Sequence, residues 1–183
     1  QRIAGILNHT DQVLCLAKSS YNQLLSFGVH AEKLDDFKYW IDLDTFTPRP
    51  EKHPTFTVLF VGRLIKKKGA SVLAEVAKHM SQIKFVFIGT GPEEEYLRKQ
   101  TKKHRNIIFL GKIPHESLPR YFSKADTLCV PSQYPEGFAH VPMEAVACGL
   151  PVVASNKGAL PEVLDKSVSI LVNPTIENLR LAI

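Results

Sequence analysis

From residue 55 onward, short apolar runs alternate with stretches in which apolar residues recur at helical spacing. The runs are rich in β-branched and aromatic residues, as is typical of strands that are buried on both faces of a parallel sheet. They predict strands at residues 57–61, 85–88, 107–110, 127–130, 152–154 and 168–172. The stretches between and after them predict helices at residues 72–80, 95–103, 118–123, 142–148, 160–164 and 177–183, and we expect the last helix to be truncated.

A strand followed by a helix, repeated along the chain, gives right-handed crossovers and a sheet that helices cover on both faces. We therefore predict an α/β fold with a doubly wound parallel sheet for residues 55–183.

The first 54 residues follow a different pattern. It predicts strands at residues 12–16 and 34–39, and a short helix at residues 19–27 that begins at a serine cap, Ser19. Residues 47–54, rich in proline and charge, indicate a surface connection. This leading segment either completes the edge of the sheet or leads in from a preceding domain, and we expect the chain to be a piece of a longer protein.

Composition narrows the class of protein only broadly. The 183 residues are 44% hydrophobic and 22% charged, as in an ordinary soluble domain, and no apolar run is long enough to span a membrane. The net charge of +5 lies on no basic helix or basic-aromatic stripe, so binding to double-stranded nucleic acid is not expected. Cys15, Cys129 and Cys148 lie in apolar stretches without metal-type or redox-type spacing, which predicts buried thiols and a cytoplasmic location.

Ligands of open parallel sheets bind at the carboxyl ends of the strands, so the loops that follow strands are the first candidates for a site. Gly62, Arg63 and the run Lys66–Lys68 follow the first predicted strand and precede a helix. Cations beside a helix N-terminus form an anion site, in which a guanidinium and an ammonium would hold a diphosphate. The alternative is a solvated basic loop, which suits Lys66 and Lys67 better than Arg63, because Arg63 directly follows a glycine at the strand end.

A second loop contains Gly89 and Gly91 and resembles the start of a dinucleotide fingerprint that lacks its third glycine. Pro92 and the three acidic residues after it predict a helix start that repels phosphate. A helix cap is therefore expected here, with the two glycines allowing a base or ribose to approach.

Residues 131–151 contain two acids, Glu136 in a loop and Glu144 in the expected first turn of a helix that Pro142 opens. Glu136 and Glu144 are either a solvated loop acid and a helix-start charge, or two acceptors for sugar or ribose hydroxyls at one site. Their spacing alone favours neither interpretation.

Taken together, the motifs resemble the C-terminal donor-binding domain of the retaining glycosyltransferases of family four, the glycosyl transferases group one. The resemblance covers most of residues 55–171, in order and at compatible spacings. The matching pieces are Phe60-Val61-Gly62-Arg63-Leu64 with Lys68-Gly69, Ile88-Gly89-Thr90-Gly91-Pro92, Phe109-Leu110-Gly111 with Pro114, Ala125-Asp126 with Pro131-Ser132, Glu136-Gly137-Phe138, Glu144-Ala145, and Gly149-Leu150-Pro151-Val152-Val153-Ala154 with Pro161-Glu162-Val163.

The resemblance implies a Rossmann-like domain, one half of the two-domain architecture called GT-B, with a role for each matching residue. Arg63 and Lys68 would neutralise the diphosphate of a nucleotide-diphosphate sugar, Glu144 would accept hydrogen bonds from the ribose, and Glu136 would hold the donor sugar. The other residues that would line the donor site are Gly62, Gly89, Gly91, Gly137, Phe138, Ala139 and, beside the base, Ile113. Arg63, Lys68 and Glu136 are the predicted catalytic residues.

The implied function is transfer of a hexose to an acceptor with retention, with neither a metal nor another cofactor. The acceptor site would belong to an N-terminal domain that is missing here, so the isolated chain should be inactive, and any membrane contact would come through that domain. Three segments depart from the family pattern: Ala139 with His140, residues 38–42 near the hinge, and residues 157–159.

Three alternatives remain at this point. A glycoside hydrolase would use the paired carboxylates but would have no purpose for Arg63 and Lys68. A sugar-nucleotide epimerase of the same architecture matches the motifs less well. A non-catalytic nucleotide-binding module would share the fold and the binding residues.

Overall fold

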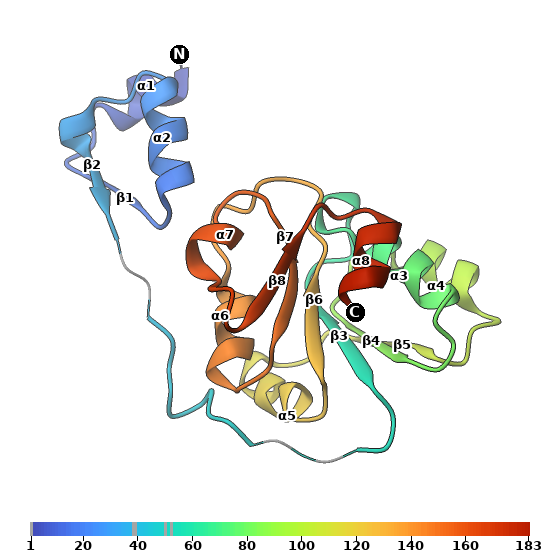
Figure 1. Ribbon diagram of the computed structural model, residues 1–183. Coiled ribbons are helices and arrows are strands. Elements are labelled where there is room, and N and C mark those ends of the chain that lie inside the picture. Colours follow the sequence, from blue (N-terminus) through green and yellow to red (C-terminus); the bar gives the residue numbers. More distant parts are fainter. Residues whose placement is uncertain (1, 38–39, 50, 52) are drawn as a thin grey trace.

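The structure is a computed structural model that describes residues 2–37, 40–49, 51 and 53–183. It consists of a large α/β domain built on a six-stranded sheet and a small unit formed by residues 2–37 (Figure 1). The described residues of the connection between them, from 40 to 56, contain neither a helix nor a strand. No helix in the described part of the chain is long and apolar enough to cross a membrane.

All six strands of the large sheet run parallel, in the order β5-β4-β3-β6-β7-β8. Their bounds are Thr57–Val61 (β3), Lys84–Ile88 (β4), Ile107–Gly111 (β5), Thr127–Val130 (β6), Val152–Ser155 (β7) and Ser169–Val172 (β8). The predicted strands are therefore confirmed, with ends that differ by one residue at most. The strand order reverses between β3 and β6, and ligands of such sheets bind outside the carboxyl ends of the strands at this reversal.

Helices cover both faces of the sheet, as predicted for a doubly wound fold (Figure 1). One face packs against α3 (Ala70–Lys78), α4 (Glu94–Thr101) and α8 (Ile176–Ala182). The other packs against α5 (Leu118–Phe122), α6 (His140–Ala147) and α7 (Leu160–Val163). Two one-turn 3-10 helices, η2 (Lys66–Lys68) and η3 (His115–Ser117), follow β3 and β5.

Strand β3 shows why the sequence produces two cores. Val58 and Phe60 point to the α3 side and Leu59 to the α5 side, and all three are 3% exposed or less. Successive strand side chains alternate between the faces of a sheet, so an unbroken apolar run supplies both cores at once. Burying a side chain of this size contributes about 1.5–3 kcal/mol.

The leading unit contains α1 (Arg2–Leu7), β1 (Val13–Cys15), α2 (Lys18–Ser26), η1 (Ala31–Lys33) and β2 (Leu34–Asp36). Strands β1 and β2 pair with each other in parallel, and within the described residues neither joins the six-stranded sheet. Of the two roles expected for this segment, completion of the sheet edge is therefore not observed. Helix α1 had no signal in the apolar pattern, and the predicted strand at residues 34–39 ends at Asp36, with Lys38 and Tyr39 outside the described residues.

The serine cap predicted for the second helix is wrong. Helix α2 begins at Lys18, its N-cap is Ala17, and no side chain of the cap residue bonds to the helix. The amide groups of Lys18 and Ser19 donate instead to the carboxylate of Glu162, at 2.6 and 2.9 Å. A carboxylate near a helix N-terminus satisfies unpaired N–H groups and is favoured by the helix dipole, so a residue from the large domain caps this helix.

Candidate functional site

A cavity of about 290 Å³ opens where β3 and β6 end, at the reversal of the strand order. It brings together six of the predicted donor-site residues, which lie up to 77 positions apart: Gly62, Arg63, Lys68, Glu136, Phe138 and Ala139. The remaining lining comes from Phe60, Val61, Cys129, Val130, Ser132, His140, Val141, Pro142 and Leu160. The other predicted site residues, Gly89, Gly91, Ile113, Gly137 and Glu144, lie outside this lining.

Gly69 seats the lysine-bearing turn against the loop that follows β6. Its φ of +74° is in the left-handed region, and a Cβ at this position would overlap the carbonyl oxygen of Pro131. The amide of Gln133 donates to the carbonyl of Lys67 at 2.8 Å, which ties the same two loops together. Only glycine combines this backbone conformation with such a close approach, so it places Lys68 beside the loop that carries Glu136.

Gly89 and Gly91 allow the loop after β4 to pack against the loop after β3. A Cβ on Gly89 would overlap the carbonyl oxygen of Gly62, and one on Gly91 would overlap that of Leu64. The amide of Leu64 donates to the carbonyl of Thr90 at 2.9 Å across the same contact. The structure thus gives both glycines a packing role, and their contact with a base or ribose stays a prediction.

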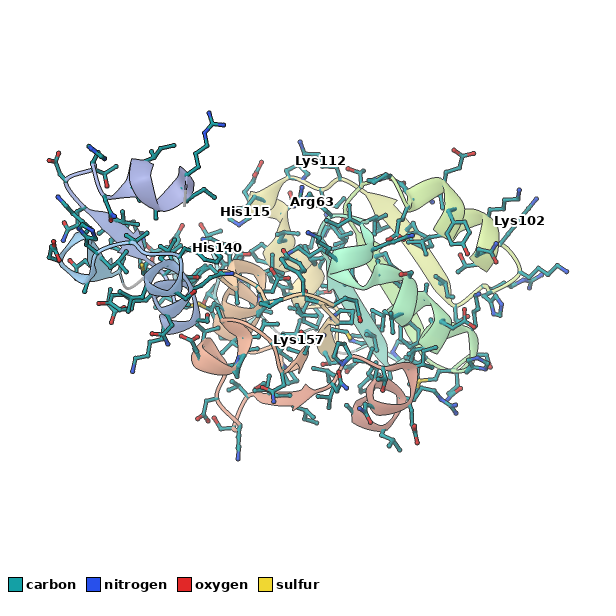
Figure 2. All side chains as sticks on the ribbon, turned by 90° about the horizontal axis from the view of Figure 1, so that it is seen from above. Arg63, Lys102, Lys112, His115, His140 and Lys157 are labelled. Atoms are coloured by element: carbon teal, nitrogen blue, oxygen red, sulfur yellow. The ribbon has the colours of Figure 1, made fainter. Side chains whose placement is uncertain are left out.

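Arg63 follows the last residue of β3 and Gly62, and its side chain is exposed. It has no ion-pair or hydrogen-bond partner among the residues described. Figure 2 views the molecule from above, the side to which the carboxyl ends of the strands point, and shows Arg63 near His115 in projection. An unpaired guanidinium at the mouth of the cavity is free to bind an anion with two parallel hydrogen bonds.

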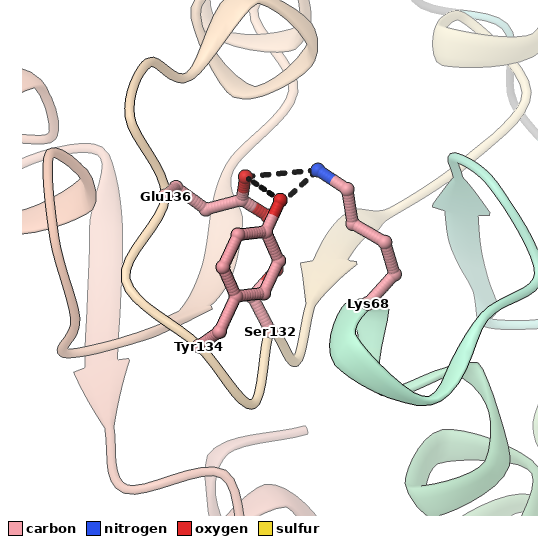
Figure 3. Close-up of polar contacts among 4 residues, drawn as sticks. All are labelled: Lys68, Ser132, Tyr134 and Glu136. Carbon is pink, nitrogen blue, oxygen red and sulfur yellow. Dashed lines mark hydrogen bonds and ion pairs between the residues drawn. The ribbon is translucent and has the colours of Figure 1, made fainter. Parts of the chain in front are cut away.

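Glu136 accepts hydrogen bonds from three side chains at once (Figure 3). The Nζ of Lys68 lies 2.8 Å from Oε1 and 2.9 Å from Oε2, the hydroxyl of Tyr134 donates to Oε2 at 3.1 Å, and the hydroxyl of Ser132 donates to Oε1. The carboxylate is 6% exposed, so these partners replace water. The predicted diphosphate cation and the predicted sugar acid are therefore paired with each other in this state.

The N-terminal turn of α6 also faces the cavity, because Ala139, His140, Val141 and Pro142 line it. Helix α6 begins at His140, so the prediction that Pro142 opens it is wrong by two residues. A proline is tolerated there because the amide groups of a first helical turn have no intrahelical acceptor. The partial positive charge of this helix end adds to that of Arg63 and Lys68.

Glu144 consequently lies two residues further along α6 than predicted, in the second turn, and is 5% exposed. Its Oε1 is 2.8 Å from the Nε2 of His115, a residue of η3. Its Oε2 is buried and has no hydrogen-bond partner in the described structure. Ile113, predicted to lie beside the base, is partly buried between β5 and η3 and packs against the α5-side core.

The leading unit touches the large domain close to the predicted sugar-binding loop. The hydroxyl of Ser20 donates to the carbonyl of Gly137 at 3.4 Å, next to the Glu162 cap on α2. Burial raises the pKa of Glu162, but the hydrogen bonds from Ser19 and Lys18 outweigh it and hold this pKa below its ordinary value. Glu162 thus stays ionised and caps α2 across the two parts of the chain.

Sequence reasoning missed Ser132, Tyr134, His115 and Glu162 as parts of this arrangement. Ser132 and Glu162 stand in the matching motifs without an assigned role, whereas nothing in the pattern marks Tyr134, and the spacing of His115 matches no metal-ligand pattern. All three cysteines are buried free thiols, as predicted. Burial raises the pKa of Cys148 to about 11, with a smaller contribution from Glu144.

The sequence model of the family described as glycosyl transferases group 1 matches residues 44–183, which is 140 of the 183 residues. The chain belongs to the glycosyl transferases group 1 family. Its six-stranded parallel sheet with helices on both faces is the Rossmann-like domain of the GT-B architecture.

Two curated glycosyltransferases illustrate the similarity in sequence. D-inositol 3-phosphate glycosyltransferase of Mycobacteroides abscessus is 30% identical over 187 residues, covering 91% of this chain and 42% of that protein. The amylovoran biosynthesis glycosyltransferase AmsK of Erwinia amylovora is 29% identical over 171 residues, covering 86% and 42%. The chain therefore spans less than half the length of both relatives.

Two solved structures share the fold. Sucrose-phosphate synthase of Thermosynechococcus elongatus superimposes with a TM-score of 0.88 at 28% identity, over 98% of this chain and 50% of that one. Anabaena HepE, in complex with UDP and glucose, gives a TM-score of 0.86 at 23% identity, over 98% and 55%.

Proposed function

We propose that this chain forms the donor-binding half of a glycosyltransferase that transfers a hexose from a nucleoside-diphosphate sugar, with retention, to an acceptor held by a separate N-terminal domain. One observation supports this above the others. Arg63, exposed and unpaired within the described residues, the ammonium of Lys68 and the N-terminus of α6 surround one cavity at the carboxyl ends of β3 and β6. Family membership and the names of the curated relatives support the same assignment.

The diphosphate would bind between Arg63 and Lys68. Two phosphates carry more charge than one side chain neutralises, and a guanidinium and an ammonium fixed on neighbouring loops offer several charge-assisted hydrogen bonds. Lys68 must exchange Glu136 for a phosphate oxygen when this happens, because both oxygens of Glu136 accept hydrogen bonds from its Nζ.

The same exchange would release Glu136 for the donor sugar. Once Lys68 turns to phosphate, the carboxylate keeps its bonds from Ser132 and Tyr134 and has lone pairs free for sugar hydroxyls. Gly137 and Phe138 follow directly and would contact the sugar or phosphate through their backbone. Glu144 would accept hydrogen bonds from the ribose hydroxyls, and Ile113, which follows β5, would lie beside the base.

The bond between the anomeric carbon and the phosphate oxygen breaks in this reaction, and its electron pair stays on the diphosphate. Arg63, Lys68 and the α6 N-terminus would stabilise that charge, and cations already in place need no reorganisation at the moment of reaction. We propose that this charge compensation operates without a metal or another cofactor. A glycoside hydrolase is disfavoured, because it would have no use for Arg63 and Lys68 at the same cavity as the carboxylate.

The three buried free thiols suit a reducing compartment, and we propose that the protein acts in the cytoplasm. Any contact with a membrane would come through the domain that holds the acceptor.

Titration of the chain with UDP, GDP and ADP and with their glucose and mannose conjugates, followed by amide NMR shifts, tests the proposal. We expect one base to bind with a dissociation constant between about 1 mM and tens of micromolar, or about 4–6 kcal/mol, and no detectable sugar transfer. Arg63→Ala should weaken binding at least about tenfold, since it removes a charge-assisted bond pair. Arg105→Ala, which removes an exposed arginine outside the cavity lining, is the matched control. A folded chain that binds none of these nucleotides would refute the assignment.

A further inference from the structure

Glu144 is closed off by a neighbour that the family resemblance does not include. Oε1 is 2.8 Å from the Nε2 of His115, and Oε2 is buried without a partner among the described residues. The side chain of Glu144 is 7% exposed and that of His115 is 64% exposed. The imidazole is therefore the outermost group at this carboxylate, and a hydroxyl arriving from solvent meets it first.

His115 is held in this position from its other side. Its ring lies 5.2 Å from the ring of Phe46, centroid to centroid and tilted by 54°, and Phe46 is itself 3% exposed. The contact with Phe46 holds the imidazole of His115 over Glu144, so the imidazole N–H is positioned to donate to the carboxylate. A carboxylate only accepts, and Nε2 therefore carries the proton in this bond.

We propose that His115 is a specificity-determining residue that competes with ribose hydroxyls for Glu144. The inference rests on the proposed function, in which Glu144 accepts from the ribose. The imidazole N–H satisfies Oε1 while the nucleotide is absent, and the ribose gains a bond at Glu144 only by taking the place of that donor. Affinity for the ribose is then reduced by the free energy of the His115–Glu144 bond, whereas affinity for the diphosphate is not.

The opposite role, in which His115 holds Glu144 ready for the ribose, is disfavoured by the same contacts. An orienting partner would sit behind the carboxylate and leave its accessible oxygen free. Here the buried oxygen is the one without a partner among the described residues, and the oxygen with a partner is the one under the exposed ring.

The test is a double-mutant cycle in which the side chain of residue 115 is changed in the protein and the ribose hydroxyls are removed from the ligand. His115→Phe keeps a ring against Phe46 and removes the N–H, and His115→Gln keeps an N–H donor. We measure the dissociation constant of each variant for the nucleoside diphosphate that the wild type binds and for its 2′,3′-dideoxy analogue. His79→Phe, which alters another exposed histidine beside a glutamate, 3.7 Å from Glu75, is the matched control.

We expect His115→Phe to bind the ribonucleotide about three- to tenfold more tightly, because the buried carboxylate regains a donor only from the ligand. The dideoxy analogue should bind all variants alike, and His115→Gln should resemble the wild type. Weaker ribonucleotide binding by His115→Phe, or equal changes for both ligands, overturns the inference and leaves the proposed function standing. If the folded wild type binds no nucleotide, both fall.

Discussion

Replacing Glu136 with glutamine removes one negative charge from the cavity and keeps the shape of the side chain. Ser132 and Tyr134 donate to different oxygens of the carboxylate, so one hydroxyl can still donate to the amide oxygen and the other can accept from the amide group, but Lys68 loses its counter-charge. We predict that Glu136→Gln lowers the stability of the protein and at the same time raises its affinity for a free nucleoside diphosphate. Both effects come from the ammonium of Lys68, which loses its partner: the folded protein loses an ion pair, and a diphosphate no longer competes with Glu136 for the ammonium.

The geometry sets the magnitude. At the 2.8 Å that separates Nζ of Lys68 from Oε1 of Glu136, two unit charges attract by about 6 kcal/mol at an effective dielectric constant of 20. Desolvation of both ions offsets much of this, and removing one partner of a buried pair usually costs about 3–5 kcal/mol. Because 26% of the Lys68 side chain stays exposed, water takes over part of its solvation, and we expect a loss of about 2–3 kcal/mol.

Urea denaturation of the wild type and the variant measures the loss, and calorimetric titration with the nucleoside diphosphate measures the gain, expected to be about tenfold in affinity. Glu94→Gln is the control, since it breaks a helix pair at 2.9 Å in which Arg98 is exposed and Glu94 partly exposed, and it should cost only about 0.3–0.5 kcal/mol. If Glu136→Gln lost no more stability than the control, or bound the nucleotide more weakly than the wild type, the reasoning would be refuted.

Two further predictions concern the loops around the cavity. Gly69→Ala should lower the free energy of unfolding in urea by more than about 3 kcal/mol, because it adds an overlap with Pro131 to the strain of a left-handed residue. The control is Gly111→Ala, where φ is +73° but the space is open, and it should cost only about 1–2 kcal/mol. Equal losses in the two variants would show that the overlap is relieved elsewhere. Glu162→Gln should shift the amide resonances of Lys18 and Ser19, and exposed Glu177→Gln should not. In the wild type, the folded pKa of Glu162 lies below its ordinary value, so the cap that Glu162 forms on α2 is complete above about pH 4.3 and is lost as the pH falls through the folded pKa. Amide shifts of Lys18 and Ser19 that do not change on acidification would contradict this cap.

The apolar pattern was sufficient for the four inner strands of the sheet because they are buried on both faces. A run such as residues 58–61 contains no polar residue, so its length and neighbours define the strand almost to the residue. The start of α6 was harder, because proline is tolerated at any position of a first turn and Pro142 is the third residue of the helix. The cap of α2 could not be read locally at all, since Glu162 lies 144 positions from Lys18.

The candidate site divides in the same way. The family resemblance placed Arg63, Lys68, Glu136 and Ala139 at one site, and the topology brings them into one cavity. That Lys68 and Glu136 pair with each other was not predictable, because the contact depends on Gly69 seating one loop on another 68 residues away in sequence. Side-chain partners of this kind follow from tertiary packing, which local patterns do not encode.

The Lys68–Glu136 ion pair has a consequence for how the proposed reaction would end. A nucleotide sugar offers phosphate to the lysine and hydroxyls to the glutamate, so both partners of the broken pair find a replacement. After transfer, the spent nucleotide still offers phosphate to Lys68, but the sugar hydroxyls that occupied Glu136 are gone. Glu136 would then compete with the diphosphate for Lys68, which would favour release of the spent nucleotide over retention of the intact donor.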